Sequence, residues 1–197
     1  MPRSGSALRV GTLILMVLAA RVLPAQARAA SPARELQGTP LDSAARATAL
    51  RVARDIMRVA RYCALVTRDA SAGPVARTID PAPPDSLMVV RFVTNPRTRK
   101  VRQLAADPRV ALYYFDATAQ RYATLYGRAR VVTNADDRAR RWHEAWTPFY
   151  PDRERSATLY EVIPERLEVV SPGEGLLGDS LSWAPPTVRF PPARRSR

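Results

Sequence analysis

The sequence predicts a mainly β (α+β) domain with six or seven short antiparallel strands and a few short flanking helices. Apolar, β-branched stretches recur through the middle of the chain, and turn residues separate most of them. Hydrophobic residues make up 46% of the 197 residues, enough for one domain with a core. Strands of this number and length are typical of a small barrel or of a sandwich, and their spacing does not separate the two.

The first 27 residues have the pattern of a secretory signal peptide. Arg3 and Arg9 give a charged start, an apolar run follows over residues 10–20, and Ala25-Gln26-Ala27 matches a cleavage signature. The run is short for a bilayer, so we expect no stable membrane span. We expect a periplasmic or secreted protein with a linker over residues 28–41; the alternative is an uncleaved amphipathic anchor.

The predicted barrel domain covers residues 42–171. Asp42 or Ser43 can cap a helix that runs to about Arg61 with one apolar face. Strands are expected over residues 62–67, 75–79, 87–94, 109–115, 120–133, 157–163 and 166–170. A short helix follows the third strand, and a second helix is expected over residues 136–146. Residues 172–197, rich in Gly and Pro, should form an extension that lies across the barrel or a partner subunit.

The most informative segment is residues 87–116. Its first strand ends at Asn95, and Thr98, Arg99 and Lys100 stand where the short helix begins. Free backbone N–H groups at a helix start and cationic side chains both favour a phosphate group. The segment therefore predicts a phosphate site. Lys100 is the only lysine among the 31 cationic residues.

Other features of the composition favour structural interpretations. The net charge is +13, but the arginines are scattered, and neither a zinc-ligand spacing nor a nucleic-acid module is recognisable. We therefore expect no nucleic-acid partner and no metal. Cys63 is the only cysteine and should be a buried hydrophobe. His143, the sole histidine, could be a general base or a haem ligand, but a surface or interface position is favoured. Trp142, Trp146 and Phe149 should pack at the barrel or at a dimer seam.

Three separated stretches resemble one known family. They are VARTID (residues 75–80), TNPRTRKVRQLAADPRVALYYFD (94–116) and RYATLYGRARVV (121–132). Together they resemble the flavin-binding split-barrel superfamily of pyridoxamine 5'-phosphate oxidase, most closely its small general-stress-protein-like members. The resemblance covers roughly residues 44–170. It favours a split barrel over a sandwich, and it implies a homodimer in which two protomers build each flavin site.

The resemblance also implies which residues would bind FMN. Arg77, Arg99 and Lys100 would hold the phosphate, and Thr98 would donate its hydroxyl. The resemblance places the backbone of Thr78, Val93 and Thr94 along the ring and the ribityl chain. Tyr122 stands where relatives often have a polar side chain from the next strand. No residue of the chain is assigned a catalytic role, because in this family the flavin carries the reaction.

Two departures from the family pattern argue against vitamin B6 oxidation as the reaction. Ala82 stands where the vitamin oxidase has a lysine, and its C-terminal substrate motif has no counterpart beyond Trp183. We expect an FMN-dependent oxidoreductase of another small molecule. The alternatives are a protein of the same fold that holds flavin, haem or another tetrapyrrole without turnover, and an oxidoreductase that uses a deazaflavin.

Overall fold

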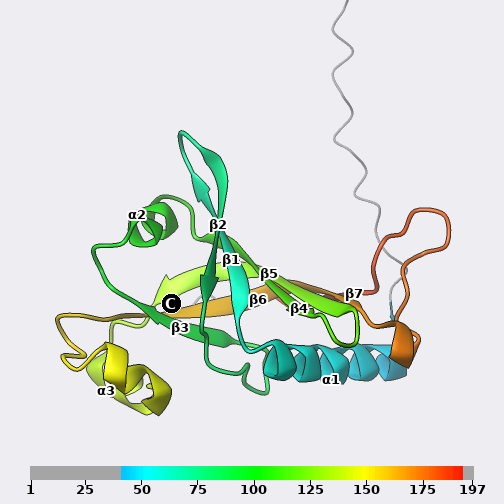
Figure 1. The fold of residues 1–197 in the computed structure, drawn as a ribbon, viewed down its shortest axis with the longest axis horizontal. Helices are drawn as coiled ribbons and strands as arrows, with labels where there is room; N and C mark the ends of the chain where they lie inside the picture. Colours follow the sequence, from blue (N-terminus) through cyan, green and yellow to red (C-terminus); the bar gives the residue numbers. More distant parts are fainter. Residues whose placement is uncertain (1–40, 193–197) are drawn as a thin grey trace, which may run out of the picture. The chain divides into compact units, whose positions relative to one another are not determined.

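A computed structural model of the chain describes residues 41–192, and it contains one seven-stranded antiparallel sheet with few helices (Figure 1). The strands are β1 (Cys63–Asp69), β2 (Gly73–Ile79), β3 (Val90–Thr94), β4 (Arg109–Asp116), β5 (Arg121–Val131), β6 (Thr158–Val170) and β7 (Thr187–Arg189). The helices are α1 (Ser43–Ala60), α2 (Arg99–Ala106) and α3 (Ala135–Arg140), with the 3-10 helices η1 (Glu144–Phe149) and η2 (Pro172–Glu174). The predicted mainly β split barrel is confirmed.

The segments predicted as a signal peptide and a linker lie outside the described residues, apart from Leu41, as does the end of the C-terminal extension after residue 192. None of the helices within residues 41–192 combines the length and the apolar character that a membrane crossing requires. The domain boundaries proposed from the sequence stay a prediction.

The order of the strands leaves the barrel open on one side. Six strands follow the order β2-β1-β4-β5-β6-β3, and β7 pairs with β6. β2 and β3 are therefore the two ends of this row, with no ladder between them. One backbone bond joins the chain just after β2 to β3, from Ala82 N to Arg91 O at 2.8 Å. This split between β2 and β3 is where the predicted phosphate residues lie.

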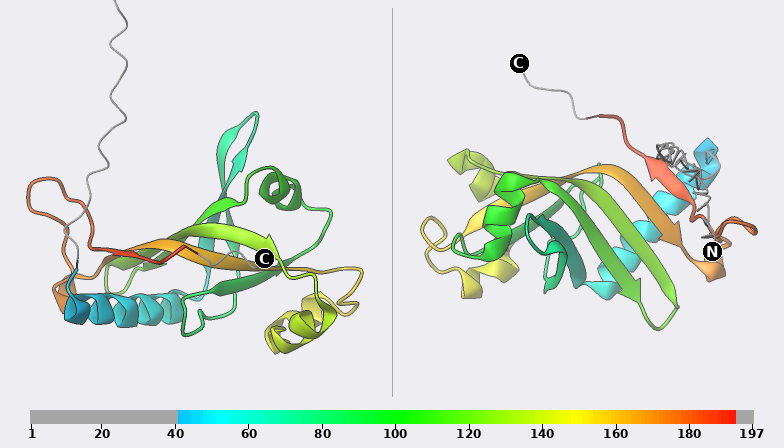
Figure 2. Two further views of the ribbon diagram at one scale, coloured as in Figure 1. Left: turned by 180° about the vertical axis from the view of Figure 1, so that it is seen from behind. Right: turned by 90° about the horizontal axis from the view of Figure 1, so that it is seen from above.

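Helix α1 covers one face of the sheet and packs against β4, β5 and β6 (Figures 1 and 2). Asp42 caps it, since its carboxylate accepts a hydrogen bond from Ala45 N at 2.8 Å. The buried positions recur every three or four residues, as a helix with one apolar face requires. They are Ala49, Val52, Ala53, Ile56 and Met57. The predicted helix and its apolar stripe are thus present, and Cys63 is buried beside them as expected.

The two strands predicted before and after Pro164 form the single strand β6. The pairing with β5 shifts at this point, so Gly127 faces Pro164 while Tyr126 faces Arg166. Proline has no N–H to offer a ladder, and a bulge lets the strand continue past it. The extra residue, Glu165, accepts a hydrogen bond from Phe190 N at 3.0 Å.

The helix predicted over residues 136–146 is wrong in its second half. The α-helix ends at Arg140, and a separate 3-10 helix begins at Glu144. Among the residues of α3 none is buried, so little packing supports a longer helix. Trp146 instead packs into the body of the chain, and its indole N–H donates to Asp80 O at 3.3 Å. Phe149, also expected to pack, is 75% exposed.

The C-terminal extension contributes a strand that the sequence did not predict. β7 pairs with β6 over three residues, and Val188 joins the main core. Arg46 of α1 also donates to the carbonyl oxygen of Arg189 at 2.9 Å. This part of the extension therefore lies against the barrel.

Candidate functional site

Arg77 lies on β2, directly opposite Leu65 of β1, at the open side of the barrel. Its guanidinium donates to Thr67 Oγ1 and, at 2.8 Å, to Gln103 Oε1 of α2. These bonds fix two of its nitrogen atoms. A fixed, planar fork is the geometry that suits a phosphate oxygen pair.

Lys100 reaches the same region from the first turn of α2. Its ammonium donates to Thr94 Oγ1, at the end of β3, at 2.8 Å. Thr94 is buried, and its hydroxyl lies 3.2 Å from Thr98 Oγ1. The ammonium group of Lys100 therefore links the start of α2 to the end of β3.

The start of α2 leaves its backbone donors without a side-chain cap. Thr98 is the N-cap, but its hydroxyl donates to Asn95 O at 2.9 Å and makes no capping bond to the helix. The first turn contains no acidic residue. The positive end of the helix dipole is thus available to an anion beside the cationic side chains.

The cations of this cluster lie close enough to disfavour one another's charge. Burial lowers the pKa of Arg77, and the neighbouring Arg99 lowers it further. Burial also lowers the pKa of Lys100, with a second contribution from Arg77. An anion bound among the three would offset both effects. We call Arg77, Thr98, Arg99 and Lys100 the cationic cluster.

The cationic cluster differs from Arg91 and Arg121, two other partly buried arginines, because no carboxylate of the described residues forms an ion pair with it. Arg91 pairs with Asp85 and Glu161, each at 2.9 Å. Arg121 pairs with three carboxylates, of which Asp116 is the most buried, at 2.9 Å. Arg77 and Lys100 bond only neutral groups within the chain described. Their charge is therefore not neutralised by a carboxylate within the described chain.

Gln103 was not predicted as a site residue, although its side chain links α2 to β1 and β2 through hydrogen bonds. It is buried, accepts hydrogen bonds from Thr67 and Arg77, and donates to Asp69 Oδ2 at 2.8 Å. That bond is the largest of the causes that hold the pKa of Asp69 below its usual range. A polar residue beside apolar Leu104 on the inner face of a short helix is the signal that could have found it.

The other predicted site residues differ in their position relative to the cationic cluster. Thr94 lies beside the cationic cluster and is joined to it by hydrogen bonds with Lys100 and Thr98. Thr78 follows Arg77 on β2 and is exposed, because alternate side chains of a strand point to opposite faces. Val93 is half-buried on β3 and packs against the small apolar cluster of Val132, Trp146 and Leu159.

Tyr122 is not brought to the cationic cluster within one chain. It pairs with Val170, at the far end of β6 from the residue that pairs with Thr94. Its ring lies 5.7 Å from that of Tyr113, on the side of the sheet that bears exposed aromatic residues.

The remaining candidates lie away from this cluster. His143 is exposed and precedes η1. Burial raises the pKa of the Cys63 thiol to about 12, so this cysteine is a poor nucleophile.

Comparison with solved structures gives the same fold at low sequence identity. A protein related to general stress protein 26 of Bacillus subtilis (pyridoxinephosphate oxidase family), from Clostridium acetobutylicum, matches with a TM-score of 0.60 and 15% identity, over 76% of this chain and 97% of that one. A heme binding protein from Mycobacterium smegmatis matches with a TM-score of 0.50 and 21% identity, over 60% of this chain and 52% of that one. A pyridoxamine 5'-phosphate oxidase-related, FMN binding protein from Nostoc punctiforme matches with a TM-score of 0.49 and 16% identity, over 76% and 96%.

None of the curated proteins compared with the chain matches it significantly. The family model described as pyridoxamine 5'-phosphate oxidase does match, over residues 51–171. The matched part runs from α1 through β6 and contains the whole cationic cluster. Because it covers more than half of the 197 residues, the chain belongs to the pyridoxamine 5'-phosphate oxidase family.

Proposed function

We propose that this protein binds FMN through the cationic cluster and acts as an FMN-dependent oxidoreductase of a small molecule. The observation that carries the proposal is the pair of partly buried cations, Arg77 and Lys100, that bond only neutral groups among the described residues. Burying such charges is costly unless an anion compensates them. The phosphate of FMN is a dianion and would compensate both.

The residues of the cluster suit the separate tasks of holding a phosphate. Arg77 offers a planar fork, which Thr67 and Gln103 keep in place. Lys100 supplies a point charge, and the start of α2 supplies backbone N–H donors. Bound flavin would supply the transfer of electrons, and the protein would orient it and limit the access of water.

The substrate is proposed to differ from vitamin B6. Ala82 is partly buried against a small apolar cluster that contains Trp146 and Leu159, and it offers no charge to a substrate phosphate. This supports the expectation drawn from the absence of a lysine at this position. The choice of substrate then depends on the surface around the flavin ring.

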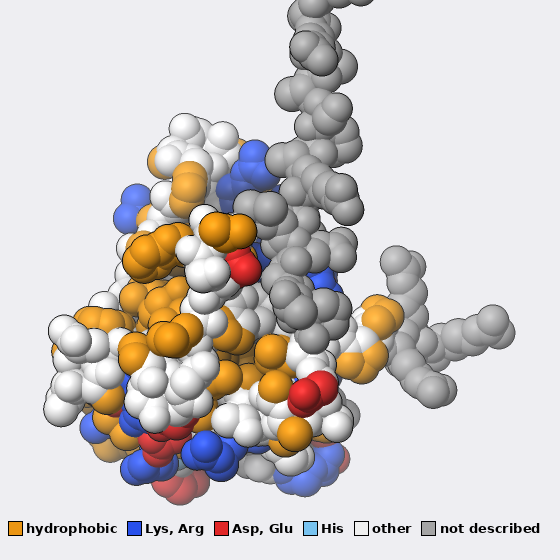
Figure 3. All heavy atoms as spheres, turned by 90° about the vertical axis from the view of Figure 1, so that its right-hand side faces the viewer, with side chains coloured by type: hydrophobic (Ala, Val, Ile, Leu, Met, Phe, Trp, Pro, Cys, Tyr) orange, Lys and Arg blue, Asp and Glu red, His pale blue; other side chains and the backbone are white. Residues whose placement is uncertain are grey.

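The proposal includes a homodimer with shared sites, as the family resemblance implies. Tyr122 lies far along β6 from the cluster of its own chain, so it would have to serve the site of the partner. Tyr113 and Phe115, on the same region of the sheet, are 40% and 50% exposed. Figure 3 views the side toward which the β4–β5 hairpin points in Figure 1, and apolar side chains gather in the middle of that view. We propose that a second copy of the chain covers the face of the sheet that bears Tyr113, Phe115 and Tyr122.

The test of the cofactor compares FMN with riboflavin, which lacks the phosphate. Lys100→Ala should weaken FMN roughly ten- to a hundredfold, because a charge-assisted contact is worth about 1.5–3 kcal/mol. Riboflavin should bind the wild type more weakly than FMN and should be nearly indifferent to the substitution. Titrations that follow flavin fluorescence at fixed salt measure both.

Arg51→Ala is the matched control for the loss of one charge. Arg51 is exposed on α1 and takes part in no ion pair among the described residues, so its removal should leave both affinities unchanged. If Lys100→Ala weakens riboflavin as much as FMN, the cluster supports the fold and does not bind phosphate. Unchanged FMN binding would refute the proposed site.

A second candidate function is the binding of haem or another tetrapyrrole without turnover. It is favoured by the structural likeness to the mycobacterial heme binding protein. The absorption spectrum of protein purified from its native compartment separates the candidates. Flavin gives two bands in the near ultraviolet and the blue, haem gives a Soret band, and a deazaflavin gives a single band between them.

We also propose that the protein is exported, on the basis of the charged start, the apolar run and the Ala25-Gln26-Ala27 signature. Sequencing of the N-terminus of the mature protein should then begin near Arg28. An intact Met1 on the bulk of the protein, recovered from the cytosol, would contradict export.

A further inference from the structure

The loop between η2 and β7, residues 175–186, presents large apolar side chains to solvent. Leu181 and Trp183 are 92% and 85% exposed, and Leu177 is 59% exposed. In Figures 1 and 2 this loop stands on the side of the sheet opposite α1. We call it the apolar loop. Large apolar side chains that are exposed together on one segment are typical of a surface that binds another molecule.

Hydrogen bonds within the apolar loop order it before any partner arrives. Asp179 Oδ1 accepts bonds from Leu181 N at 3.1 Å and from Ser182 N at 2.8 Å. The bond from Ser182 N is the largest of the causes that lower the pKa of Asp179. Trp183 N also donates to Asp179 O at 2.8 Å. Because the loop is already ordered, less conformational entropy is lost when its side chains are buried against a partner.

The apolar loop lies within the longest stretch of the sequence that has no cationic residue. This stretch is residues 167–188, and it contains Glu168, Glu174 and Asp179. The whole chain, in contrast, has 31 cationic and 18 acidic residues. An anionic lipid surface would repel an acidic loop, whereas the cationic surface of this protein would attract it. The charge of the loop therefore favours a second copy of the chain as its partner.

A hollow of about 500 Å³ lies on the same sheet and has the complementary character. Its lining includes Val66 of β1, Ala111 of β4 and Tyr126 of β5, which pair in register across the three strands. The charged residues of the lining are two cations and one carboxylate, Arg68, Arg109 and Asp107. The hollow thus combines apolar side chains with an excess of positive charge, as an acidic and apolar loop requires.

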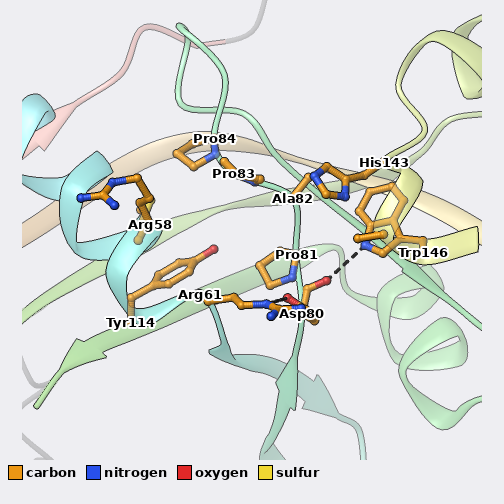
Figure 4. Close-up of a pocket in the computed structure, with 12 residues that line it drawn as sticks. Arg58, Arg61, Asp80, Pro81, Ala82, Pro83, Pro84, Tyr114, His143 and Trp146 are labelled. Carbon is orange, nitrogen blue, oxygen red and sulfur yellow. Dashed lines mark hydrogen bonds and ion pairs between the residues drawn. The ribbon is translucent and has the colours of Figure 1, made fainter. Parts of the chain in front are cut away.

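The hollow lies on the face of the sheet that is proposed to meet the partner. Ala111 is two residues before Tyr113 on β4, and alternate side chains of a strand share a face. Tyr114, between Tyr113 and Phe115, points to the opposite side and lies beside the end of α1 (Figure 4). Along β4 the hollow therefore lies toward the start of the strand, and Phe115 lies toward its end.

The apolar loop begins at the other end of this face. Arg121, at the start of β5, pairs with Glu174 of η2 at 3.3 Å, so the loop leaves the sheet beside the β4–β5 hairpin. The hollow, in contrast, adjoins the cationic cluster, because Thr67 lines the hollow and bonds to Arg77. The loop and the hollow are thus too far apart along β4 to meet by a small movement within one chain.

A twofold dimer brings these two ends together. The proposed shared flavin site requires the end of one copy that bears Tyr122 to approach the cationic cluster of the other. A twofold axis that crosses β4 gives this arrangement, because the interface of such a dimer is the same patch on both copies. The same axis carries the apolar loop of each copy to the hollow of the other.

We propose that the apolar loop of each protomer docks in the hollow of its partner, with Leu181 and Trp183 against the apolar lining. The proposal rests on the proposed homodimer and does not depend on FMN. It adds two symmetric contacts to the central aromatic contact of Tyr113 and Phe115. Trp183 would be the main anchor of each, since tryptophan is enriched among the residues that dominate the affinity of interfaces.

The first measurement is the dissociation constant of the dimer, from sedimentation equilibrium of the full-length protein. Trp183→Ser should raise this constant roughly ten- to a hundredfold, as the loss of a buried aromatic anchor does. Phe149→Ser is the matched control, because Phe149 is an aromatic residue of η1 that is 75% exposed and lines no part of the hollow. It should leave the constant unchanged.

The second measurement follows the burial of Trp183 itself. The difference in fluorescence between the wild type and Trp183→Phe isolates this side chain from Trp142 and Trp146. Acrylamide should quench it poorly in the wild-type dimer and strongly in Phe115→Lys, which places a charge in the proposed interface. Quenching that is poor in monomeric Phe115→Lys as well would show that the loop is covered within its own chain, and would overturn the proposal.

A double-mutant cycle tests whether the loop occupies the hollow. Ala111→Arg places a bulky charge among the lining residues, so it should also weaken the dimer and expose Trp183. Combined with Trp183→Ser it should weaken the dimer no more than the stronger single change, because both changes remove one contact. Additive effects would show that the loop and the hollow act separately, and would overturn the proposal.

The remaining outcomes separate this proposal from the dimer on which it rests. A wild type that is monomeric at every concentration would refute the homodimer and, with it, the docking of the loop. A wild-type dimer in which acrylamide quenches Trp183 strongly would overturn the docking alone. Protection of Trp183 only after addition of vesicles of phosphatidylcholine and phosphatidylglycerol would assign the loop to a lipid surface and would also overturn it.

Discussion

The pairing of a lysine with two arginines gives the proposed phosphate site a dependence on pH. The pKa of Lys100 lies below its ordinary 10.5, first because of burial and then because of Arg77. Only the protonated lysine attracts phosphate, so FMN affinity should be fully present below the lowered pKa and should be lost as the pH rises through it. An ordinary exposed lysine would keep its charge to a higher pH.

Titrations of FMN from about pH 7.5 up to the ordinary lysine value of 10.5 test this, because the second pKa of a phosphate monoester is about 6 and the phosphate is dianionic throughout. In Lys100→Arg the guanidinium keeps its charge over this range, so the affinity of that variant should stay flat. Riboflavin provides the control, since it has no phosphate. A fall in affinity that is identical for wild type and Lys100→Arg would show that another group titrates.

At the residue scale, the cationic residues of the site could be predicted from the sequence, but the side chain that holds Arg77 in place could not. Arg99 and Lys100 are adjacent in the chain, so a helix start was enough to place them together. Arg77 came from the family resemblance, since more than 20 residues separate it from them. Gln103 was missed because its place beside Leu104 is a weak local signal and its role depends on contacts with Thr67 and Asp69, which are distant in the sequence.

At the scale of elements, Gly127 is the residue on which the β5–β6 pairing most clearly depends. A Cβ atom there would lie 2.2 Å from the carbonyl oxygen of Ile163 and 3.2 Å from Cα of Pro164. Both are backbone atoms, so the bulge itself would have to move. Gly127→Ala should therefore lower the free energy of unfolding by about 1–3 kcal/mol, measured by urea denaturation.

Gly173→Ala is the matched control, because a Cβ at that position in η2 meets no atom within 4 Å. Its effect should be near zero or slightly stabilising, since alanine restricts the unfolded chain. If the two variants unfold at the same urea concentration, the close approach at the bulge does not constrain the sheet.

The elements were predictable where the pattern was long and regular. The helix from Ser43 and the strands on either side of the short helix follow directly from their periodicity. The prediction failed where tertiary contacts decide the local structure. No residue of α3 is buried, and the packing of Trp146 against Asp80 replaces the expected helical turns. The three residues of β7 are too few to carry a pattern of their own.

At the scale of the whole molecule, spacing alone could not distinguish a barrel from a sandwich, and the resemblance made that choice. The sequence analysis also offered the segment from Trp142 to Trp146 as a surface for a dimer seam. Trp146 is buried within its own chain, and Trp142 packs against it with ring centroids 5.6 Å apart. The aromatic residues of β4 and β5 are the better surface, because Tyr113 and Phe115 remain exposed in the single chain.

Phe115→Lys tests this surface. The ring of Phe115 stacks on that of Tyr113, with ring centroids 6.5 Å apart, and the proposed dimer would bury it. A lysine at this position would place a charge inside the interface. Sedimentation equilibrium should show the wild type at twice the chain mass and Phe115→Lys largely as monomer. Phe149→Lys is the control, because that phenylalanine is exposed in η1 and should not affect assembly.

The same variant decides whether the flavin site is shared. If Tyr122 completes the site of the partner, loss of the dimer should weaken FMN even though every residue of the cationic cluster is unchanged. The weakening should extend to riboflavin, because Tyr122 is not one of the residues proposed to hold the phosphate. Lys100→Ala should instead spare riboflavin. If Phe115→Lys is monomeric and binds FMN as tightly as the wild type, the shared site is refuted. The proposed role of the cationic cluster in binding the phosphate is then unaffected.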